Sequence, residues 1–315
     1  MIDLLTSLLQ AGIHQGAPIL LVVLGEVICE RSGNLNLGLE GMMLAGALFG
    51  FMGTYYTGSL AAGCLAGILA GTALSLIHGF LTIDLNANQI VSGLALAVFG
   101  SGLTSFIGDK TSPVKMTMAV APTAFRRLPI PILSEIPILG PILFQHNLLV
   151  YISGGLVLAV WFLLYRTRYG LNIRSCGENP ACAEVMGVSV RATRYLCVLT
   201  GGAFAGLGGA YLSLALSPGW KELMTGGRGW VAVALVIFGN WKPGRAALGA
   251  LLFGTLYALD STIQARGTRI PTQFLQMLPY LLTIVFLAAS RLGIFKEVLG
   301  APAALGQPYS RESKE

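Results

Sequence analysis

The feature that most constrains this chain is a succession of long apolar stretches that hold few charged residues. A helix needs about 20 apolar residues to cross the hydrocarbon core of a membrane. Eight stretches approach or reach that length: 12–29, 37–57, 60–83, 89–108, 147–165, 195–216, 245–263 and 272–290. Because only 11% of the residues are charged, the chain cannot supply the charged exterior of a soluble domain this large. The sequence therefore predicts an all-α integral membrane protein, a polytopic helical bundle in the inner or plasma membrane of the cell.

The number of crossings depends on a ninth, shorter apolar stretch at 229–241, which is either a further crossing or a re-entrant segment. Cytoplasmic loops carry an excess of Lys and Arg, and the loop 166–194 holds five arginines, so we expect it inside. The long, Pro-rich loop 109–146 is then outside. The chain would start outside and end inside, which requires an odd number of crossings. We expect about nine transmembrane segments, with eight and ten as alternatives.

The chain divides into three parts of different composition. Residues 1–11 predict a short amphipathic helix at the membrane surface, and they lack the basic start of a cleavable signal peptide. Residues 12–295 form the transmembrane domain, and residues 296–315 form a polar C-terminal tail. The topology of the N-terminal part stays open at this point.

Missing patterns argue against several classes of function. The basic residues fall between apolar stretches and do not cluster with aromatic residues, which disfavours a nucleic-acid partner. The chain has no phosphate-binding loop of the ATPase type and no His-Glu-x-x-His zinc helix. Cys176 and Cys182 are too far apart for a Cys-x-x-Cys pair. We therefore predict no catalytic residue, no metal site and no cofactor bound by this chain itself.

The densest group of polar residues within an apolar region runs from Glu26 to Glu40. A charge at the centre of a membrane costs about 2.5–3.5 kcal/mol, so such groups need partners or a water-filled cavity. Irregular backbone is tolerated at that depth only where protein or water satisfies it. The run is either a broken helix that lines a solute path or an ordinary cytoplasmic turn. On the first alternative, Asn34, Asn36 and Glu40 are path residues.

A second polar patch begins at Asp84, close to the expected inner face. Its Asn86, Asn88 and Gln89 side chains can bind a polar solute without the penalty of burying a charge. Loops are commonly rich in these residues for no functional reason. The patch is therefore either part of the solute path or a plain loop, and both alternatives stay open.

Small residues recur along the apolar stretch 195–216. Gly202 and Gly206 are four residues apart, and Gly209 follows three residues later, so they lie close to one face of a helix. Small residues in this pattern let neighbouring helices approach closely in lipid. We predict that these glycines serve helix packing and not chemistry.

A short helix is predicted within the basic loop 166–194. Asn179 is suited to cap its N-terminus, Pro180 is suited to its first position, and Gly187 would end it after barely two turns. A rigid helix exposed on the cytoplasmic side between two spans can dock a partner protein. The alternative is a plain connecting loop.

Four stretches, in their order and separation, resemble signatures of a known family of membrane proteins. They are Glu30-Arg31-Ser32-Gly33 with Leu35-Asn36-Leu37-Gly38-Leu39-Glu40-Gly41, then Gly177-Glu178-Asn179-Pro180, then Gly227-Arg228-Gly229-Trp230 with its continuation to Trp241, and Pro243-Gly244. These stretches resemble the membrane subunits of ATP-binding-cassette (ABC) importers, in particular the branched-chain amino acid, ribose and nucleoside permeases. The likeness is strongest to the nucleoside type, and it covers roughly residues 12–295.

The resemblance implies a set of partners and of site residues. Such permeases pair with a second permease, either a paralogue or an identical copy, and bind two cytoplasmic subunits that carry ATP and Mg²⁺. A solute-binding protein or lipoprotein delivers the solute from outside. By similarity, the segment 177–187 would couple to the ATPase, and the stretch 34–40 would lie near the translocation path. The implied coupling residues are Gly177, Glu178, Asn179, Pro180, Glu184 and Gly187.

The expected function is therefore the permease subunit of an ATP-driven importer of a small polar solute, with nucleosides as the first candidate and simple sugars as the alternative. An ion-coupled secondary transporter would need paired charges inside the spans, and few charges lie there. An intramembrane enzyme would need a catalytic set at one depth, and none is evident. The sequence does not fix the solute.

Overall fold

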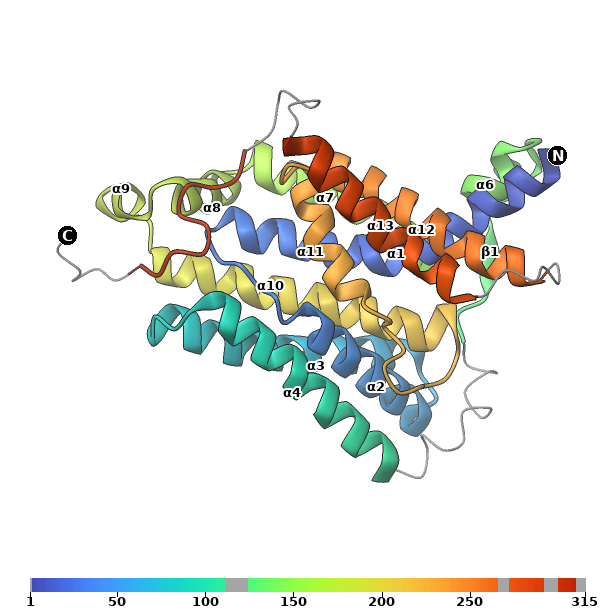
Figure 1. Ribbon diagram of the computed structural model, residues 1–315, viewed down its shortest axis with the longest axis horizontal. Helices are drawn as coiled ribbons and strands as arrows, with labels where there is room; N and C mark the ends of the chain where they lie inside the picture. The colour runs from blue at the N-terminus through green and yellow to red at the C-terminus, as the bar shows by residue number, and fades with distance from the viewer. Residues whose placement is uncertain (1, 111–123, 266–271, 292–299, 310–315) are drawn as a thin grey trace.

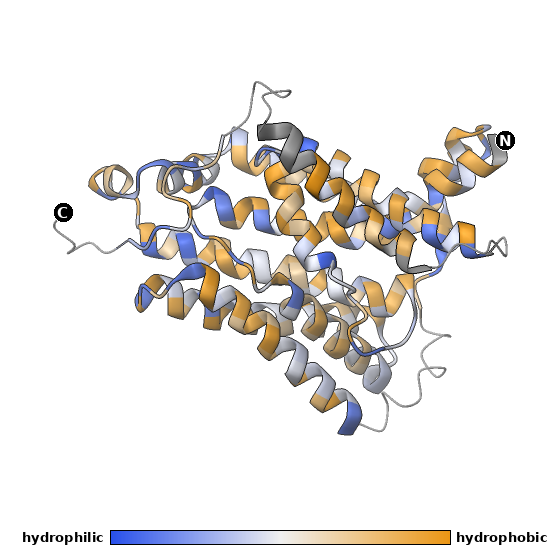
Figure 2. Ribbon diagram, viewed as in Figure 1, coloured by the Kyte–Doolittle hydropathy of each residue, from blue (hydrophilic) through white to orange (hydrophobic). Residues whose placement is uncertain are grey.

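The computed structural model describes residues 2–110, 124–265, 272–291 and 300–309, and these residues form a helical bundle (Figure 1). The expectation of an all-α membrane protein is confirmed. Hydrophobic residues dominate along the helices, while hydrophilic ones are more frequent toward the two ends of the bundle (Figure 2). Large apolar side chains on the outer helices are exposed, for example Val98 at 75% and Leu158 at 71%. Exposed apolar surface of this kind is suited to contact with lipid or with another apolar surface.

The helices follow the apolar stretches closely. The long ones are α1 (Ile2–Arg31), α2 (Leu39–Thr57), α3 (Leu60–Gly79), α4 (Gln89–Lys110), α7 (Leu148–Arg166), α10 (Val190–Tyr211), α12 (Pro243–Ala265) and α13 (Thr272–Arg291). Wider turns continue two of them, η1 (Phe80–Asp84) after α3 and η4 (Leu212–Leu216) after α10. The short helices are α6 (Leu139–Phe144), α8 (Arg168–Glu178), α9 (Pro180–Val185), α11 (Arg228–Phe238) and the 3-10 turn η3 (Leu133–Glu135).

Six helices in the described parts of the chain are long and apolar enough to cross a membrane: α1, α3 with η1, α4, α7, α10 with η4, and α12. Helix α2, at 19 residues, is not among these six helices; most of it is buried, and its last turn is exposed at Tyr56. The stretch 229–241 corresponds to α11, which has 11 residues. At 1.5 Å per residue, α11 covers about half of a hydrocarbon core. This length favours the re-entrant alternative for that segment.

The N-terminal part differs from the expected separate surface helix. Residues 2–11 are the first turns of α1, which runs without a break to Arg31. Gly12 lies within α1 and packs against α12. A Cβ at Gly12 would come within 3.0 Å of the Cα of Thr255. Gly16 similarly faces the carbonyl of Ala250. Gly12 and Gly16 are therefore positions of close packing on α12.

The segments outside the long helices are more structured than loops. Strands β1 (Arg127–Pro129) and β2 (Gln145–Asn147) pair antiparallel within the loop 109–146, of which residues 111–123 lie outside the described part. The loop 166–194 contains α8 and α9. Residues 300–309 of the expected polar tail pack on the end of the bundle that carries α8 and α9 (Figure 1). The rest of the tail, 296–299 and 310–315, is outside the described residues.

The centre of the bundle is α10, which packs on α1, α2 and α3. An added Cβ at Gly202 would lie 2.2 Å from Oγ of Ser75, and one at Gly206 would lie 2.1 Å from the carbonyl oxygen of Gly67. A Cβ at Gly209 would lie 2.0 Å from the carbonyl oxygen of Met43. The three glycines thus occupy the places where α10 touches the backbone of its neighbours, which brings the helix axes close together.

Candidate functional site

The short helix in the basic loop is built by local sequence signals. The side chain of Asn179 accepts a hydrogen bond from the backbone N–H of Cys182 at 3.0 Å, and Pro180 is the first helical residue of α9. Gly187 follows with φ of +85°, a backbone conformation that glycine adopts without strain. The preceding α8 is capped by Thr167. These caps give α9 the start and length that its sequence predicted.

The outer surface of α9 is apolar and exposed. Val185 is 87% exposed and Met186 is 82% exposed, while Ala183 on the opposite side is buried against Cys176 and Val190. Figure 1 places α9 at one extreme of the bundle. Two large apolar side chains at such a projecting position are unusual for a free surface and are typical of a contact surface.

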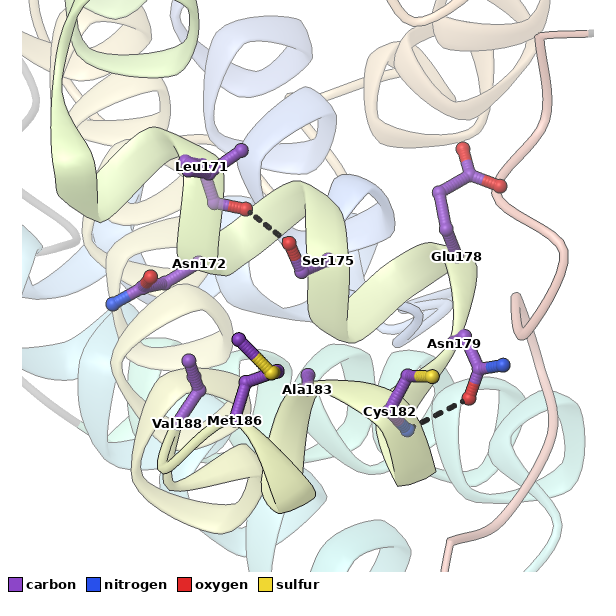
Figure 3. Close-up of a pocket in the computed structure, with 9 residues that line it drawn as sticks. All are labelled: Leu171, Asn172, Ser175, Glu178, Asn179, Cys182, Ala183, Met186 and Val188. Carbon is purple, nitrogen blue, oxygen red and sulfur yellow. Dashed lines mark hydrogen bonds between the residues drawn. The ribbon is translucent and has the colours of Figure 1, made fainter.

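A cavity of about 460 Å³ separates α8 from α9. Figure 3 shows side chains of α8 and of α9 with its following turn on its two sides. Its described lining consists of Leu171, Asn172, Ser175, Glu178, Asn179, Cys182, Ala183, Met186 and Val188. Four of the six implied coupling residues, from Gly177 to Pro180, are consecutive and lie at the junction of the two helices. The cavity therefore adjoins the contact surface of α9.

The C-terminal residues 300–309, here called the C-terminal brace, hold α8 and α9 from one side. The N–H of Ala304 donates to the carbonyl of Gly177 at 2.8 Å. The hydroxyl of Tyr309 donates to Oε2 of Glu184 at 2.7 Å, and the N–H of Ala303 donates to Oε2 of Glu178 at 3.4 Å. Two of the predicted coupling carboxylates are thus bound within the chain.

On its other side the C-terminal brace is fastened to the long helices. The N–H of Gly306 donates to the carbonyl of Gly33 at 3.1 Å, directly after α1. The buried Arg194, at the start of α10, donates to the carbonyl of Gln307 at 3.3 Å. The N–H of Gly300 donates to Oδ1 of Asn240 at 2.8 Å, after α11. The brace therefore connects α9 to the C-terminal ends of α1 and α11 and to the N-terminal end of α10.

The polar run from Glu26 to Glu40 contains a non-helical connection between α1 and α2, which both of its interpretations allow. Residues 32–38 enter the bundle without helical structure, and carboxyl and amide side chains bind their backbone. Oε1 of Glu26 accepts from the N–H of Asn36 at 2.9 Å, and Oδ1 of Asn36 accepts from the N–H of Gly38 at 2.9 Å. Nδ2 of Asn34 donates to Thr82 at 3.2 Å. Asn34 and Asn36 are completely buried.

Glu40 has a different position, at the N-terminus of the half-length helix α11. Its carboxylate accepts hydrogen bonds from the N–H groups of Gly227 at 2.9 Å and Gly229 at 2.7 Å. It also accepts from the hydroxyl of Thr225 at 2.5 Å. A carboxylate is favoured there because the first N–H groups of a helix are unpaired and carry a partial positive charge. Glu40 is therefore the N-terminal anchor of α11.

The second polar patch has one buried residue, Gln89, and two exposed ones, Asn86 and Asn88. Gln89 is buried and accepts from the N–H of Leu35 at 2.7 Å, which supports the break after α1. Asn88 caps α4 by accepting from the N–H groups of its first turn, and it is exposed. Asn86 is an exposed turn residue with φ of +52°. The six predicted path residues thus do not meet around one cavity in this conformation: three are buried together, Glu40 holds α11, and two are exposed.

Sequence reasoning missed two groups that connect these elements. Nε1 of Trp241 donates to Oε2 of Glu30 at 2.5 Å, and Nε of Arg31 donates to the carbonyl of Trp241 at 3.1 Å. These bonds join the last turn of α1 to the turn after α11. The second group is the C-terminal brace. Its short run of Gly, Ala and Pro residues carried no signal for docking, and the partner of Trp241 lies 211 residues away in the sequence.

The fold and its composition define a multi-pass protein of the cell membrane, with a buried non-helical connection between α1 and α2 and an exposed short helix in a basic loop. The chain belongs to the family described as branched-chain amino acid transport system / permease component, whose pattern matches residues 8–287. The resemblance found in the motifs is thereby confirmed. Members of this family are transport components of the membrane.

Relatives along the whole chain include permeases for different solutes. TsgC13 of Haloferax volcanii, provisionally named a glucose ABC transporter permease protein, is 41% identical over 97% of this chain and 98% of its own length. The guanosine ABC transporter permease protein NupQ of Bacillus subtilis is 35% identical over 98% of each chain. The nucleoside ABC transporter permease protein NupC of Lactococcus lactis is 35% identical over 93% of each chain.

A solved structure shares the fold. It is an inward-facing conformation of a transporter provisionally assigned to the metal-chelate type of ABC transporter, and it aligns over 89% of this chain and 84% of its own length. The TM-score is 0.52 and the sequence identity is 16%. At this identity the likeness concerns the arrangement of helices alone.

Proposed function

We propose that this chain is the permease subunit of an ATP-driven importer that carries nucleosides across the cell membrane. The observation that supports the proposal best is the geometry of α9, a capped helix with Val185 and Met186 exposed at one extreme of the bundle. A transporter driven by ATP on another subunit needs a rigid element through which nucleotide binding can bias the bundle. In this proposal α9 is that element, and the ATPase groove covers its apolar surface.

The other partners follow from the same proposal. ATP and Mg²⁺ belong to two cytoplasmic ATPase subunits, since the sequence of this chain has no phosphate-binding loop. A second permease, as a paralogue or an identical copy, completes the membrane part of the transporter. A solute-binding protein or lipoprotein delivers the solute on the outer side. The exposed apolar surfaces of α4 and α7 are available for lipid or for the second permease.

Nucleosides are preferred as the solute because two relatives that cover nearly the whole chain carry guanosine or nucleoside in their names. A simple sugar is the second candidate, since the relative with 41% identity carries glucose in its name. Both solutes are neutral and rich in hydroxyl groups. One architecture therefore suits either, and a transport measurement distinguishes them.

The test is reconstituted uptake. The chain is purified with the second permease and the ATPase that its neighbouring genes encode, and proteoliposomes are assayed with tritiated guanosine, adenosine and glucose. We expect uptake of the nucleosides only with ATP. Saturable uptake of glucose alone would favour the sugar alternative. Uptake that needs an ion gradient and no ATPase would contradict the proposal.

Two variants address the proposed coupling element in the same assay. Gly187→Pro cannot adopt φ of +85°, because the proline ring fixes φ near −65°. Glu178→Ala removes the carboxylate at the junction of α8 and α9. We expect both to lose uptake while the protein remains folded in the membrane. Full uptake by Gly187→Pro would count against α9 as the coupling element.

A further inference from the structure

A second cavity, of about 360 Å³, lies at the end of the bundle opposite α9. It is enclosed between the N-terminal half of α1 and the segment that carries β1, α6 and β2, which lie together at that end in Figure 1. Its volume is within the range of small-molecule sites in proteins, which is roughly 300–1,000 Å³. The side chains that matter for its chemistry are Gln10, His14, Gln15, Arg127, Gln145 and His146.

The hydrogen bonds of Asn147 determine which nitrogen of His14 carries the proton. Oδ1 of Asn147 accepts from the N–H of Val150 at 3.0 Å, so its Nδ2 amide group points the other way. That amide donates to Nε2 of His14 at 3.2 Å. Since an amide nitrogen can only donate, Nε2 of His14 accepts, and in the neutral ring the proton is on Nδ1. His14 therefore keeps an N–H donor at Nδ1.

His146 has the opposite arrangement. Its Nε2 lies 2.7 Å from the carbonyl of Ile142, which can only accept, so Nε2 carries the proton. Burial lowers the pKa of His146, so the ring is neutral at physiological pH and Nδ1 is an acceptor. Among the described residues, neither Nδ1 has a hydrogen-bond partner. Both rings contribute to the cavity wall, one with a free donor and the other with a free acceptor.

The rest of the wall is polar and nearly uncharged. Gln10, Gln15 and Gln145 add amide groups, and none of the described lining residues is acidic. The single cation is the exposed Arg127 on the hairpin. Without a carboxylate the cavity has nothing to balance a cationic ligand. Paired donors and acceptors on histidine and glutamine suit a neutral ligand with hydroxyl or heterocyclic groups.

A chain of hydrogen bonds leads from this cavity into the bundle. Oε1 of Gln15 accepts from Nη2 of Arg228 at 3.1 Å. Nη1 of Arg228 donates to the carbonyl of Thr225 at 3.2 Å, and the hydroxyl of Thr225 donates to Glu40. The cavity is thus connected through Arg228 to the N-terminus of α11, the half-length helix that Glu40 anchors.

We infer that this cavity is a binding site for a neutral solute rich in hydroxyl or heterocyclic groups, held by His14, His146 and Gln10 before it passes toward α11. The inference rests on the proposed function, because it assigns the solute of the transporter a first site within this subunit. It adds the position of that site and the residues that hold the solute. It also makes Gln15 and Arg228 the link between the site and α11.

The experiment measures equilibrium binding of tritiated guanosine, adenosine and glucose to the complete transporter in lipid nanodiscs. His14→Phe keeps a ring of similar size and removes both nitrogens, and His14→Gln restores one donor and one acceptor. Gln10→Met removes the amide at similar length. Arg127→Gln removes the rim charge, and Arg126→Gln is the matched control on the adjacent, exposed residue. Thermal unfolding of each sample identifies variants that fail to fold.

Loss of one hydrogen bond to a buried ligand corresponds to about a tenfold loss of affinity. We expect that loss for His14→Phe and Gln10→Met, partial recovery for His14→Gln, a smaller loss for the rim variant Arg127→Gln, and an affinity within about twofold of the unmodified protein for the control Arg126→Gln. Unchanged affinity in both His14→Phe and Gln10→Met would overturn the inference. Loss of binding in Arg127→Gln alone would also overturn it, because it would indicate an anion site.

Failure of the proposed function has a different signature. In that case reconstituted uptake of all three probes is independent of ATP, whatever the variants do to binding. If uptake is driven by ATP but none of the probes binds to folded transporter at the concentrations that saturate uptake, the cavity is not the site and only the inference fails.

Discussion

The backbone N–H of Gly229 donates a hydrogen bond of 2.7 Å to Oε2 of Glu40, so the first turn of α2 anchors the N-terminus of α11. Gly229 has to be a glycine for this contact, since a Cβ would lie 2.5 Å from the backbone nitrogen of Glu40. The half-length helix therefore starts inside the bundle against a carboxylate of the chain itself. Any rearrangement of α11 must either break this hydrogen bond or move α2 together with α11.

Replacing Glu40 by alanine should destabilise the protein and stop transport. The change leaves the N–H groups of Gly227 and Gly229 and the hydroxyl of Thr225 without their acceptor. The expected loss is roughly 2 kcal/mol of unfolding free energy, the usual size for a lost cap with an unpaired buried partner. Thermal unfolding in detergent and ATP-driven uptake are the measurements.

The control for this prediction is Glu222→Ala, which removes an exposed acid from the segment just before α11. It should leave both measurements unchanged. Glu40→Gln keeps one acceptor oxygen, so its unfolding temperature and its uptake should lie between those of Glu40→Ala and those of Glu222→Ala. If Glu40→Ala unfolds at the same temperature as the unmodified protein, the carboxylate does not hold α11.

The glycines of α10 should tolerate no side chain. In Gly206→Ala the new methyl group would lie 2.1 Å from the carbonyl oxygen of Gly67, and backbone cannot move aside as a side chain can. Overpacking of a tight interior costs about 1–3 kcal/mol. We expect a clear fall in the midpoint of thermal unfolding.

A matched change on another helix separates packing from helix propensity. Gly154 in α7 has no atom within 4 Å of an added Cβ, so Gly154→Ala should be neutral or stabilise by up to about 1 kcal/mol. Equal effects of the two alanines would show that α10 is not closely packed at Gly206.

Removing the C-terminal brace should uncouple ATP hydrolysis from transport. A chain that ends at residue 299 loses the bonds to Gly177, Glu184 and Arg194, and with them the direct connection between α9 and the adjacent ends of α1 and α10. We expect the ATPase to bind and hydrolyse ATP while uptake falls at least fivefold. Tyr309→Phe, which removes only the bond to Glu184, should give a smaller loss.

ATP hydrolysis and solute uptake must be measured on the same preparation. Ser310 follows the described part of the brace, and a chain that ends there is the length control. ATP-driven uptake at the normal rate in the chain that ends at residue 299 would mean that the brace is not needed to couple ATP hydrolysis to transport. Loss of ATPase binding would instead assign the brace to the docking surface.

The long helices were predictable from sequence because lipid leaves few alternatives to an apolar helix of about 20 residues. The capped helix α9 was predictable for a local reason, since Asn179, Pro180 and Gly187 each favour one backbone position. Both features depend on residues close together in the chain. They can be recognised without knowing what packs against them.

The candidate site was harder to predict because its contacts join distant parts of the chain. Asn34 and Asn36 were path residues on one of two alternatives, and their partners in the fold could not be read from the sequence: Nδ2 of Asn34 donates to the hydroxyl of Thr82, and Oδ1 of Asn36 accepts from the backbone N–H of Gly38. The docking of residues 300–309 depends on partners from 60 to more than 100 residues away, such as Asn240 and Glu184, and the stretch itself gives no sign of them. Only the folded arrangement reveals these pairs.

The central claim is that α9 docks in the ATPase, and labelling of the natural cysteines tests it directly. Cys182 is exposed on α9, whereas Cys176 is buried and burial raises the pKa of its thiol, so Cys182 should react with a maleimide and Cys176 should not. The extent of labelling at each cysteine is read by mass spectrometry with and without the ATPase subunit. We predict that the ATPase lowers the labelling rate of Cys182 at least tenfold and leaves Cys64 unchanged. An unchanged rate at Cys182 in a complex that contains the ATPase would contradict the account.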